Sequence, residues 1–292
     1  MKPEHRKPKP PWLRKRFVFN SSAKEVNNLL RGFALHTVCQ EAHCPNQMEC
    51  FGNHTATFMI LGDHCTRSCT FCAVAHGPQE PPHPEEPKRV AEAASHLGLK
   101  YVVLTSVTRD DLPDGGAAHF AATIKAVREI GDEVSVEVLV PDFQGSGQAL
   151  AAVLAAAPAV LNHNLETVPR LYPAVRPQAN YERSLQLLAE VKRLAPDTLS
   201  KSGFMVGLGE KRKEVSTLML DLRKVGCDLV TIGQYLRPSR DHHPVVKYVP
   251  PSTFEAYKVE AYSLGFLGVA SGPYVRSSYQ AESLYRKAKA ME

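Results

Sequence analysis

Six of the seven cysteines in this 292-residue chain lie within 34 consecutive positions, in two groups of three. The first group is Cys39, Cys44 and Cys50, and the second is Cys65, Cys69 and Cys72. Thiolates bind iron–sulfur clusters, and three thiolates on a four-iron cluster leave one iron open to a substrate. The CX3CX2C spacing of the second group therefore predicts a cluster with one open iron. A zinc site completed by His64 or His76 is the alternative.

Sequence features outside the cysteine groups indicate the cellular compartment in which this chemistry takes place. No apolar run approaches the roughly 18 residues of a membrane helix, and the N-terminus lacks the apolar centre of a secretory signal. Because the cytosol keeps thiols reduced, clustered cysteines in such a chain indicate metal or redox chemistry and not disulfides. We expect a cytoplasmic protein that does not bind membranes. The seventh cysteine, Cys227, is expected to be a buried apolar residue.

The formal charge of +5 comes from 35 basic and 30 acidic side chains, and the excess lies at the N-terminus. The first 16 residues hold seven Lys or Arg and one Glu. This segment is expected to be a solvated arm, or alternatively a surface for an acidic partner. Because the rest of the chain is nearly balanced in charge, we do not expect a nucleic-acid partner.

Six alternations of an apolar strand with an amphipathic helix follow residue 54. The predicted strands are 55–62, 100–107, 133–143, 159–167, 199–210 and 227–236, and the predicted helices are 85–99, 115–131, 147–157, 180–196, 213–226 and 251–266. Near-continuous apolar strands are typical of a parallel sheet covered by helices. Eight such units close an ordinary barrel, so six predict a partial barrel, with an open doubly wound sheet as the alternative.

The second cysteine group directly follows the first of these strands. Parallel α/β barrels place their active sites on the loops at the carboxyl ends of the strands. CX3CX2C in this place, with Phe71 before the last cysteine, resembles the radical S-adenosyl-L-methionine (SAM) enzymes. The first group narrows the resemblance to the lipoyl synthases. "EAHCPNQMECF", "TSVTRDDLPDGGA", "LNHNLETVPRLY" and "ASGPYVRSSYQAE" agree with that family, and the resemblance covers nearly the whole chain.

The resemblance implies two 4Fe-4S clusters and a division of the chain. Cys65, Cys69 and Cys72 would hold the cluster whose open iron binds SAM. The first cysteine group would hold an auxiliary cluster, with its fourth ligand from the serines of "RSSY", where Ser278 is favoured over Ser277. The division is an N-terminal extension at 1–54, a radical SAM partial (β/α)6 barrel at 55–264, and a C-terminal segment at 265–292.

The implied activity is sulfur insertion. A 5′-deoxyadenosyl radical from SAM would remove hydrogen from carbons 6 and 8 of an octanoyl group bound to a carrier protein, and the auxiliary cluster would donate both sulfur atoms. The implied carriers are acyltransferase subunits of 2-oxoacid dehydrogenases and the glycine cleavage H protein. The implied electron donor is a ferredoxin or flavodoxin. A methylthiotransferase and a non-enzymatic iron–sulfur or zinc protein are the competing hypotheses.

Polar residues near the ends of the later strands are candidates for holding SAM. They are Asp110, Asp111, Glu137, Asn162, Asn164, Lys201 and Ser202. Carboxylates suit the ammonium group or ribose hydroxyls of SAM, and Lys201 with Ser202 suits its carboxylate. The alternative is that these side chains start turns or satisfy one another in polar networks.

Overall fold

The computed structural model describes residues 8–14, 21–52 and 56–291. A single eight-stranded sheet forms its centre, in the order β1-β2-β5-β6-β7-β8-β9-β10. The strands are β1 (His36–Thr37), β2 (Thr57–Ile60), β5 (Tyr101–Ser106), β6 (Ser135–Leu139), β7 (Val160–Asn162), β8 (Leu199–Val206), β9 (Leu229–Gln234) and β10 (Gly268–Gly272). All neighbours run parallel except β1, which is antiparallel to β2. The predicted α/β fold with a partial barrel is confirmed.

The sheet has one more parallel strand than the six predicted β/α units contain. β10 pairs with β9, with Gly268 opposite Leu229. Glycine, alanine and serine make up most of this strand, and such small residues are depleted in strands. The segment therefore carried a weak strand signal. It adds a seventh parallel strand at the edge opposite β1.

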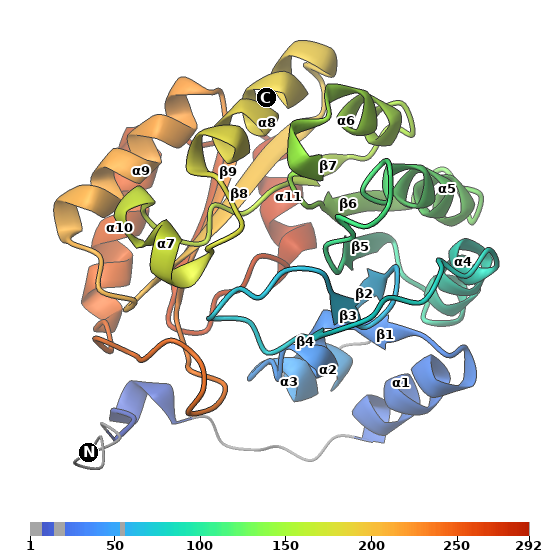
Figure 1. Ribbon diagram of the computed structural model, residues 1–292, viewed down its shortest axis with the longest axis horizontal. Coiled ribbons are helices and arrows are strands. Elements are labelled where there is room, and N and C mark those ends of the chain that lie inside the picture. The colour runs from blue at the N-terminus through green and yellow to red at the C-terminus, as the bar shows by residue number, and fades with distance from the viewer. Residues whose placement is uncertain (1–7, 15–20, 53–55, 292) are drawn as a thin grey trace.

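Helices cover the outer face of the sheet, as Figure 1 shows. They are α4 (Glu86–His96), α5 (Ala117–Arg128), α6 (Gly147–Leu154), α8 (Tyr181–Leu194), α9 (Arg212–Lys224) and α10 (Pro251–Ser263). The period-2 alternation of the strands explains this arrangement. Val102 and Leu104 of β5 belong to the same apolar cluster as Phe120 of α5, whereas Tyr101 and Val103 pack against the C-terminal helix at Ala281.

Shorter elements complete the fold around the cysteines. They are α1 (Ser21–Gly32), α2 (Val38–Glu41), α3 (Gln47–Gly52), α7 (Tyr172–Val175), β3 (His64–Cys65), β4 (Ala75–His76), and the 3-10 turns η1 (Pro11–Leu13), η2 (Phe143–Gly145) and η3 (Pro169–Leu171). β3 and β4 pair in parallel on either side of the CX3CX2C loop. The basic residues of the predicted arm lie mostly outside the described ranges.

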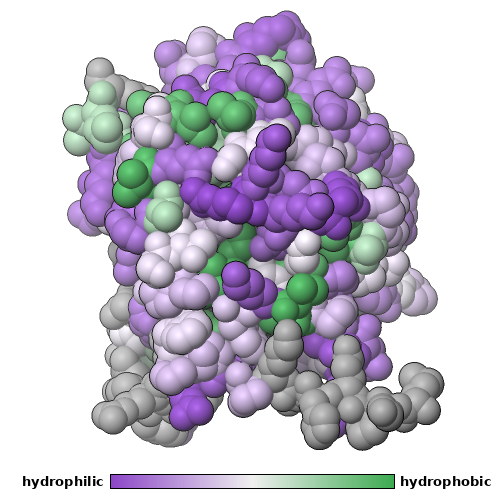
Figure 2. All heavy atoms as spheres, turned by 90° about the vertical axis from the view of Figure 1, so that its left-hand side faces the viewer, coloured by the Kyte–Doolittle hydropathy of each residue, from purple (hydrophilic) through white to green (hydrophobic). Residues whose placement is uncertain are grey.

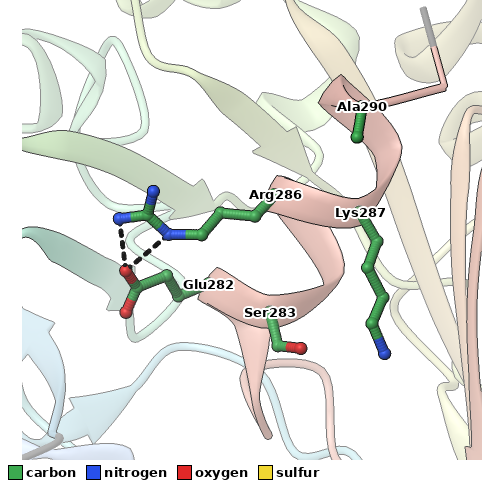
Figure 3. A pocket seen from close by; sticks show the side chains of 5 residues that line it. All are labelled: Glu282, Ser283, Arg286, Lys287 and Ala290. Atoms are coloured by element: carbon green, nitrogen blue, oxygen red, sulfur yellow. Dashed lines mark hydrogen bonds and ion pairs between the residues drawn. The ribbon is translucent and has the colours of Figure 1, made fainter.

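The C-terminal helix α11 (Ala281–Lys289) closes the amino-terminal end of the barrel. Its Leu284 and Ala288 pack against Val160, Leu199 and Leu229, which lie at or near the first positions of their strands. Figure 3 shows a pocket on the exposed side of this helix, where Arg286 pairs with Glu282. Because apolar packing fills this end, the opposite end of the barrel remains for a functional site.

None of the helices in the described ranges has both the length and the apolar character to cross a bilayer. The face shown in Figure 2 is mainly hydrophilic, with hydrophobic groups in separate small areas.

Candidate iron–sulfur and SAM site

A cavity of about 530 Å³ opens at the carboxyl ends of the parallel strands. Five of the six clustered cysteines line it, together with both serines of "RSSY"; these residues are Cys39, Cys44, Cys65, Cys69, Cys72, Ser277 and Ser278. The two cysteine groups and the C-terminal segment, which are far apart in sequence, therefore meet at one place. The sixth cysteine, Cys50, lies in α3 and is not among the residues that line the cavity.

A strained turn leads from β2 into the CX3CX2C loop. Leu61 and Gly62 have φ angles of 69° and 98°, and a non-glycine residue in that region is uncommon. The turn is held from two sides: Glu86 Oε2 accepts a hydrogen bond from the Leu61 N–H at 2.9 Å, and Arg109 Nη1 donates to the Leu61 carbonyl at 3.0 Å. Both backbone groups of Leu61 are thus satisfied, and the direction of the loop is fixed.

Arg67, between the first two cysteines of the loop, anchors the loop to two other strands. This buried guanidinium donates to Asp110 at 2.6 Å and to Asp142 at 2.6 Å, in the loops that follow β5 and β6. Burial alone would raise the pKa of Asp142, but hydrogen bonds and charge from Arg67 outweigh burial and lower that pKa to about 2. Arg183 also donates to Asp142 at 2.9 Å. The network ties the loop rigidly to the mouth of the barrel.

Arg67→Met is expected to lower the free energy of unfolding by about 3 kcal/mol, because it leaves a buried carboxylate without its main partner. The pKa of Asp142 lies below its ordinary value of 3.8, so the pairing stabilises the fold fully above about pH 4 and loses this effect as pH falls towards 2. Urea unfolding at pH 7 measures the change. Arg193→Met, which removes an exposed pair with Glu190, is the control and should change little. Equal effects of the two substitutions would contradict the assignment.

Burial favours the protonated form of three thiols of the site, those of Cys39, Cys69 and Cys72. Burial raises the pKa of Cys39 to about 11 and that of Cys72 to about 12, and it also raises the pKa of Cys69. Because iron binds thiolates, loading the site releases protons. The Cys65 sulfur accepts hydrogen bonds from the backbone N–H groups of Arg67 and Thr108, each at 3.4 Å. Such hydrogen bonds to a ligand sulfur tune the reduction potential of a cluster.

The described residues contain no group of three or more His, Cys, Asp or Glu side chains arranged to hold a single metal ion. The imidazole of His64 is paired with the neighbouring carboxylate: its Nδ1 lies 2.7 Å from Asp63 Oδ1. Three separated thiols suit the separate corners of a cluster.

Hydrogen bonds fasten the C-terminal segment to the region of the first cysteine group. Asn46 Nδ2 donates to the Tyr274 carbonyl at 2.7 Å, and the Tyr279 hydroxyl donates to Glu49 Oε1 at 2.7 Å. Ser277 Oγ accepts from Asn164 Nδ2 at 2.7 Å. Ser278 lines the cavity, and no hydrogen bond of its hydroxyl occurs within the described residues. Of the two serines, Ser278 is thus the one whose oxygen is available.

The residues predicted to hold SAM lie at different depths. Asn164 lines the cavity, whereas Glu137 and Lys201 form a buried ion pair at 2.7 Å and Asn162 is buried with an amide that has no partner among the described residues. Glu137 lies two residues before Leu139, which does line the cavity. Their positions near the ends of the strands made these residues candidates, but Glu137, Asn162 and Lys201 do not line the cavity.

The other three candidates are engaged elsewhere. Asp110 binds Arg67, and Asp111 binds Arg109 at 2.8 Å. Ser202 Oγ accepts the Leu165 N–H at 3.3 Å on the opposite face of its strand. None of them lines the cavity, so a role for these residues in holding SAM stays a prediction.

Two further charged residues, Arg176 and Glu166, line the cavity. Arg176 is buried near Cys69, and its Nη1 donates to the carbonyls of Asn164 and Leu165 while its Nε has no partner among the described residues. Glu166 accepts from Asn164 at 2.9 Å, and burial raises its pKa. Arg176 directly follows the short helix α7, and nothing in that stretch of sequence indicates a site, so only the fold brings this cation to the second cysteine group.

Comparisons with known proteins agree with this geometry. Residues 59–222, more than half of the chain, match the model of the Radical SAM superfamily. The chain is 56% identical over 274 residues to the lipoyl synthase of Caldicellulosiruptor saccharolyticus, covering 94% of this chain and 96% of that one. It is 52% identical over 286 residues to the lipoyl synthase of Alkaliphilus metalliredigens, covering 98% and 99%.

Solved structures resemble the fold at much lower identity. The crystal structure of methylornithine synthase superimposes with a TM-score of 0.54 at 14% identity and covers 94% of this chain and 93% of that one. This likeness concerns the fold alone. The two lipoyl synthases share more than half of their aligned residues with this chain over nearly its full length, which is far more specific evidence for the family. The chain belongs to the radical SAM superfamily and, within it, to the lipoyl synthase family.

Proposed function

We propose that this chain converts an octanoyl group on a carrier protein into a lipoyl group by inserting sulfur at carbons 6 and 8. The observation that carries the proposal is the meeting of two cysteine groups and the "RSSY" serines at one cavity. A radical SAM enzyme that needs no internal sulfur source would need only the second group. Three units are proposed to contribute: 1–54, 55–264 and 265–292.

The donor sets fit two 4Fe-4S clusters. Cys65, Cys69 and Cys72 would hold one, leaving a corner for SAM. Cys39, Cys44 and Cys50 would hold the auxiliary cluster, with Ser278 at its fourth corner. When bound, these groups and SAM supply a 5′-deoxyadenosyl radical and a store of sulfide. An oxygen ligand matches this soft site less well than a thiolate, so the iron at Ser278 would be the most easily lost.

The chain's own residues orient these groups and the substrate. Arg67, Glu86 and Arg109 fix the CX3CX2C loop through the contacts described above. Met59 and Leu139 line the cavity with apolar surface that suits an octanoyl chain. The packing of α11 closes the other end of the barrel to water.

The cavity rim indicates how the partners approach. Lys9 and Arg237 line the cavity, and both are cations. Octanoylated carriers would enter here, namely acyltransferase subunits of 2-oxoacid dehydrogenases or the glycine cleavage H protein. A ferredoxin or flavodoxin would supply the electrons. These partners are proposed from the family, and the positive rim would favour an acidic surface on them.

The proposal is tested with anaerobically reconstituted protein, SAM, a reductant and an octanoyl-lysine peptide. The expected products are peptides with one and then two added sulfur atoms, identified by mass, together with 5′-deoxyadenosine. A peptide that gains a methylthio group would instead identify a methylthiotransferase. Deoxyadenosine formation with an unmodified peptide would contradict the proposed substrate.

Ser278→Ala is expected to lower formation of the dithiolated peptide by about 10- to 100-fold while deoxyadenosine formation changes little, because it removes only a ligand of the auxiliary cluster. Ser277→Ala is the matched control. Its hydroxyl is already bound to Asn164, so product formation should stay within about threefold of wild type. If Ser277→Ala has the larger effect on the product, the ligand assignment is wrong.

A further inference from the structure

The C-terminal segment approaches strand β9 more closely than a side chain would allow. A Cβ atom built on Gly233 of β9 would lie 2.2 Å from the Val275 carbonyl oxygen and 3.3 Å from Arg276 Nη1. Gly233 does not have a positive φ angle. Close approach of the segment, and not backbone freedom, is therefore what requires glycine at this position. At Gly203 of β8 a Cβ would lie 3.1 Å from Ser277 Oγ, but Thr231 Oγ1 at 2.5 Å and Asn164 Oδ1 at 2.8 Å already exclude it.

The opposite side of the segment is held by the region of the first cysteine group. Asn46 and Glu49 form the two hydrogen bonds to Tyr274 and Tyr279 that are described above. Arg276 lines the same cavity as Cys44 and Glu166. The segment is thus enclosed between the strands β8 and β9 and the first cysteine group.

We propose that Gly233 is a positioning residue for the fourth ligand of the auxiliary cluster. The missing side chain sets how deeply residues 275–278 enter the barrel mouth, and this depth determines where the Ser278 oxygen lies. The inference rests on the proposed function. A methyl group on Gly233 would push the Val275 carbonyl outward by about 1 Å, and a misplacement of that size can cost about 100-fold in rate.

The test compares Gly233→Ala with wild type in two measurements. In the chain before iron is added, hydrogen exchange at residues 273–279 is expected to rise about tenfold, with no change in β5 or α5. After reconstitution, dithiolated peptide is expected to fall about 100-fold while deoxyadenosine formation persists. Gly147→Ala is the matched control, because a Cβ at Gly147 meets nothing within 4 Å, and it should leave both measurements unchanged.

A second variant keeps the test decisive if Gly233→Ala does not fold. Tyr279→Phe removes only the hydroxyl that binds Glu49, so it loosens the segment from the opposite side without a clash. Faster exchange at 273–279 and a lower ratio of dithiolated peptide to deoxyadenosine are expected for this variant as well. If Gly233→Ala folds and leaves both the exchange and the product ratio unchanged, the inference is overturned. If Gly233→Ala does not fold, the same unchanged result in Tyr279→Phe overturns it.

The wild-type chain separates this inference from the proposed function. If wild type makes no thiolated peptide, the proposed function fails, and the exchange measurement still reports whether Gly233 places the segment. If wild type makes the product and Gly233→Ala equals it, the function stands and the positioning role is wrong.

Discussion

Replacing Cys69 by alanine is expected to lower 5′-deoxyadenosine formation by ~10³-fold or more while the chain still binds about four irons. The same result is expected for Cys65→Ala and Cys72→Ala. Each variant leaves two thiolates in the loop that Arg67 anchors, which is too few to hold the SAM-binding cluster. The auxiliary cluster has its own three cysteines and should persist.

Cys227→Ala is the matched control for these substitutions. Cys227 is buried outside the cavity, and its thiol donates to the Leu229 carbonyl at 3.4 Å, at the amino-terminal end of β9. It should keep the wild-type iron content and rate of SAM cleavage. Deoxyadenosine formation at the wild-type rate in any variant of the second cysteine group would contradict the assignment of that group to SAM chemistry.

Replacing Cys44 by alanine is expected to have the opposite pattern: SAM cleavage persists, and formation of thiolated peptide falls to background. Cys39→Ala and Cys50→Ala should behave alike. The first cysteine group lies on α2, α3 and the turn between them, whereas the CX3CX2C loop is held by contacts to β5 and β6. Because the two supports are separate, loss of one cluster should leave the other in place.

Iron analysis and product analysis together check this second prediction. Iron content should fall from about eight to about four per chain, and deoxyadenosine should still form in the presence of the octanoyl peptide. If a Cys44→Ala chain with about four irons still makes dithiolated peptide, the sulfur comes from another source and the role of the first cysteine group is wrong.

The sequence predicted the parts of this structure that depend on local pattern. Six alternations of strand and helix were visible because apolar strand residues and amphipathic helices repeat with different periods. β10 was not counted among them because Gly268 and Gly272 give little strand signal. Glu137 and Asn162 were candidates because they lie near the ends of their strands, but that position says nothing of depth, and neither lines the cavity.

The contacts that assemble the site are long-range, and no local pattern specifies them. Arg67 and Asp142 form a hydrogen bond although they are 75 positions apart in the sequence, and Asn46 and Tyr274 do so although they are 228 apart. In the sequence, Gly233 is only a residue of low strand propensity. The reason for a glycine there is visible only in the structure, where the C-terminal segment lies against it. The cysteine groups were predictable because their spacing is itself the chemical signal.

The most direct test of the account follows the sulfur atoms themselves. The chain is reconstituted with iron and ³⁴S-sulfide, freed of unbound sulfide, and mixed with SAM, reductant and the octanoyl-lysine peptide. The account predicts a dithiolated peptide in which both added atoms are ³⁴S. A dithiolated peptide that carries unlabelled sulfur, or no thiolated peptide while deoxyadenosine accumulates, would contradict the claim that this chain inserts sulfur from its own auxiliary cluster.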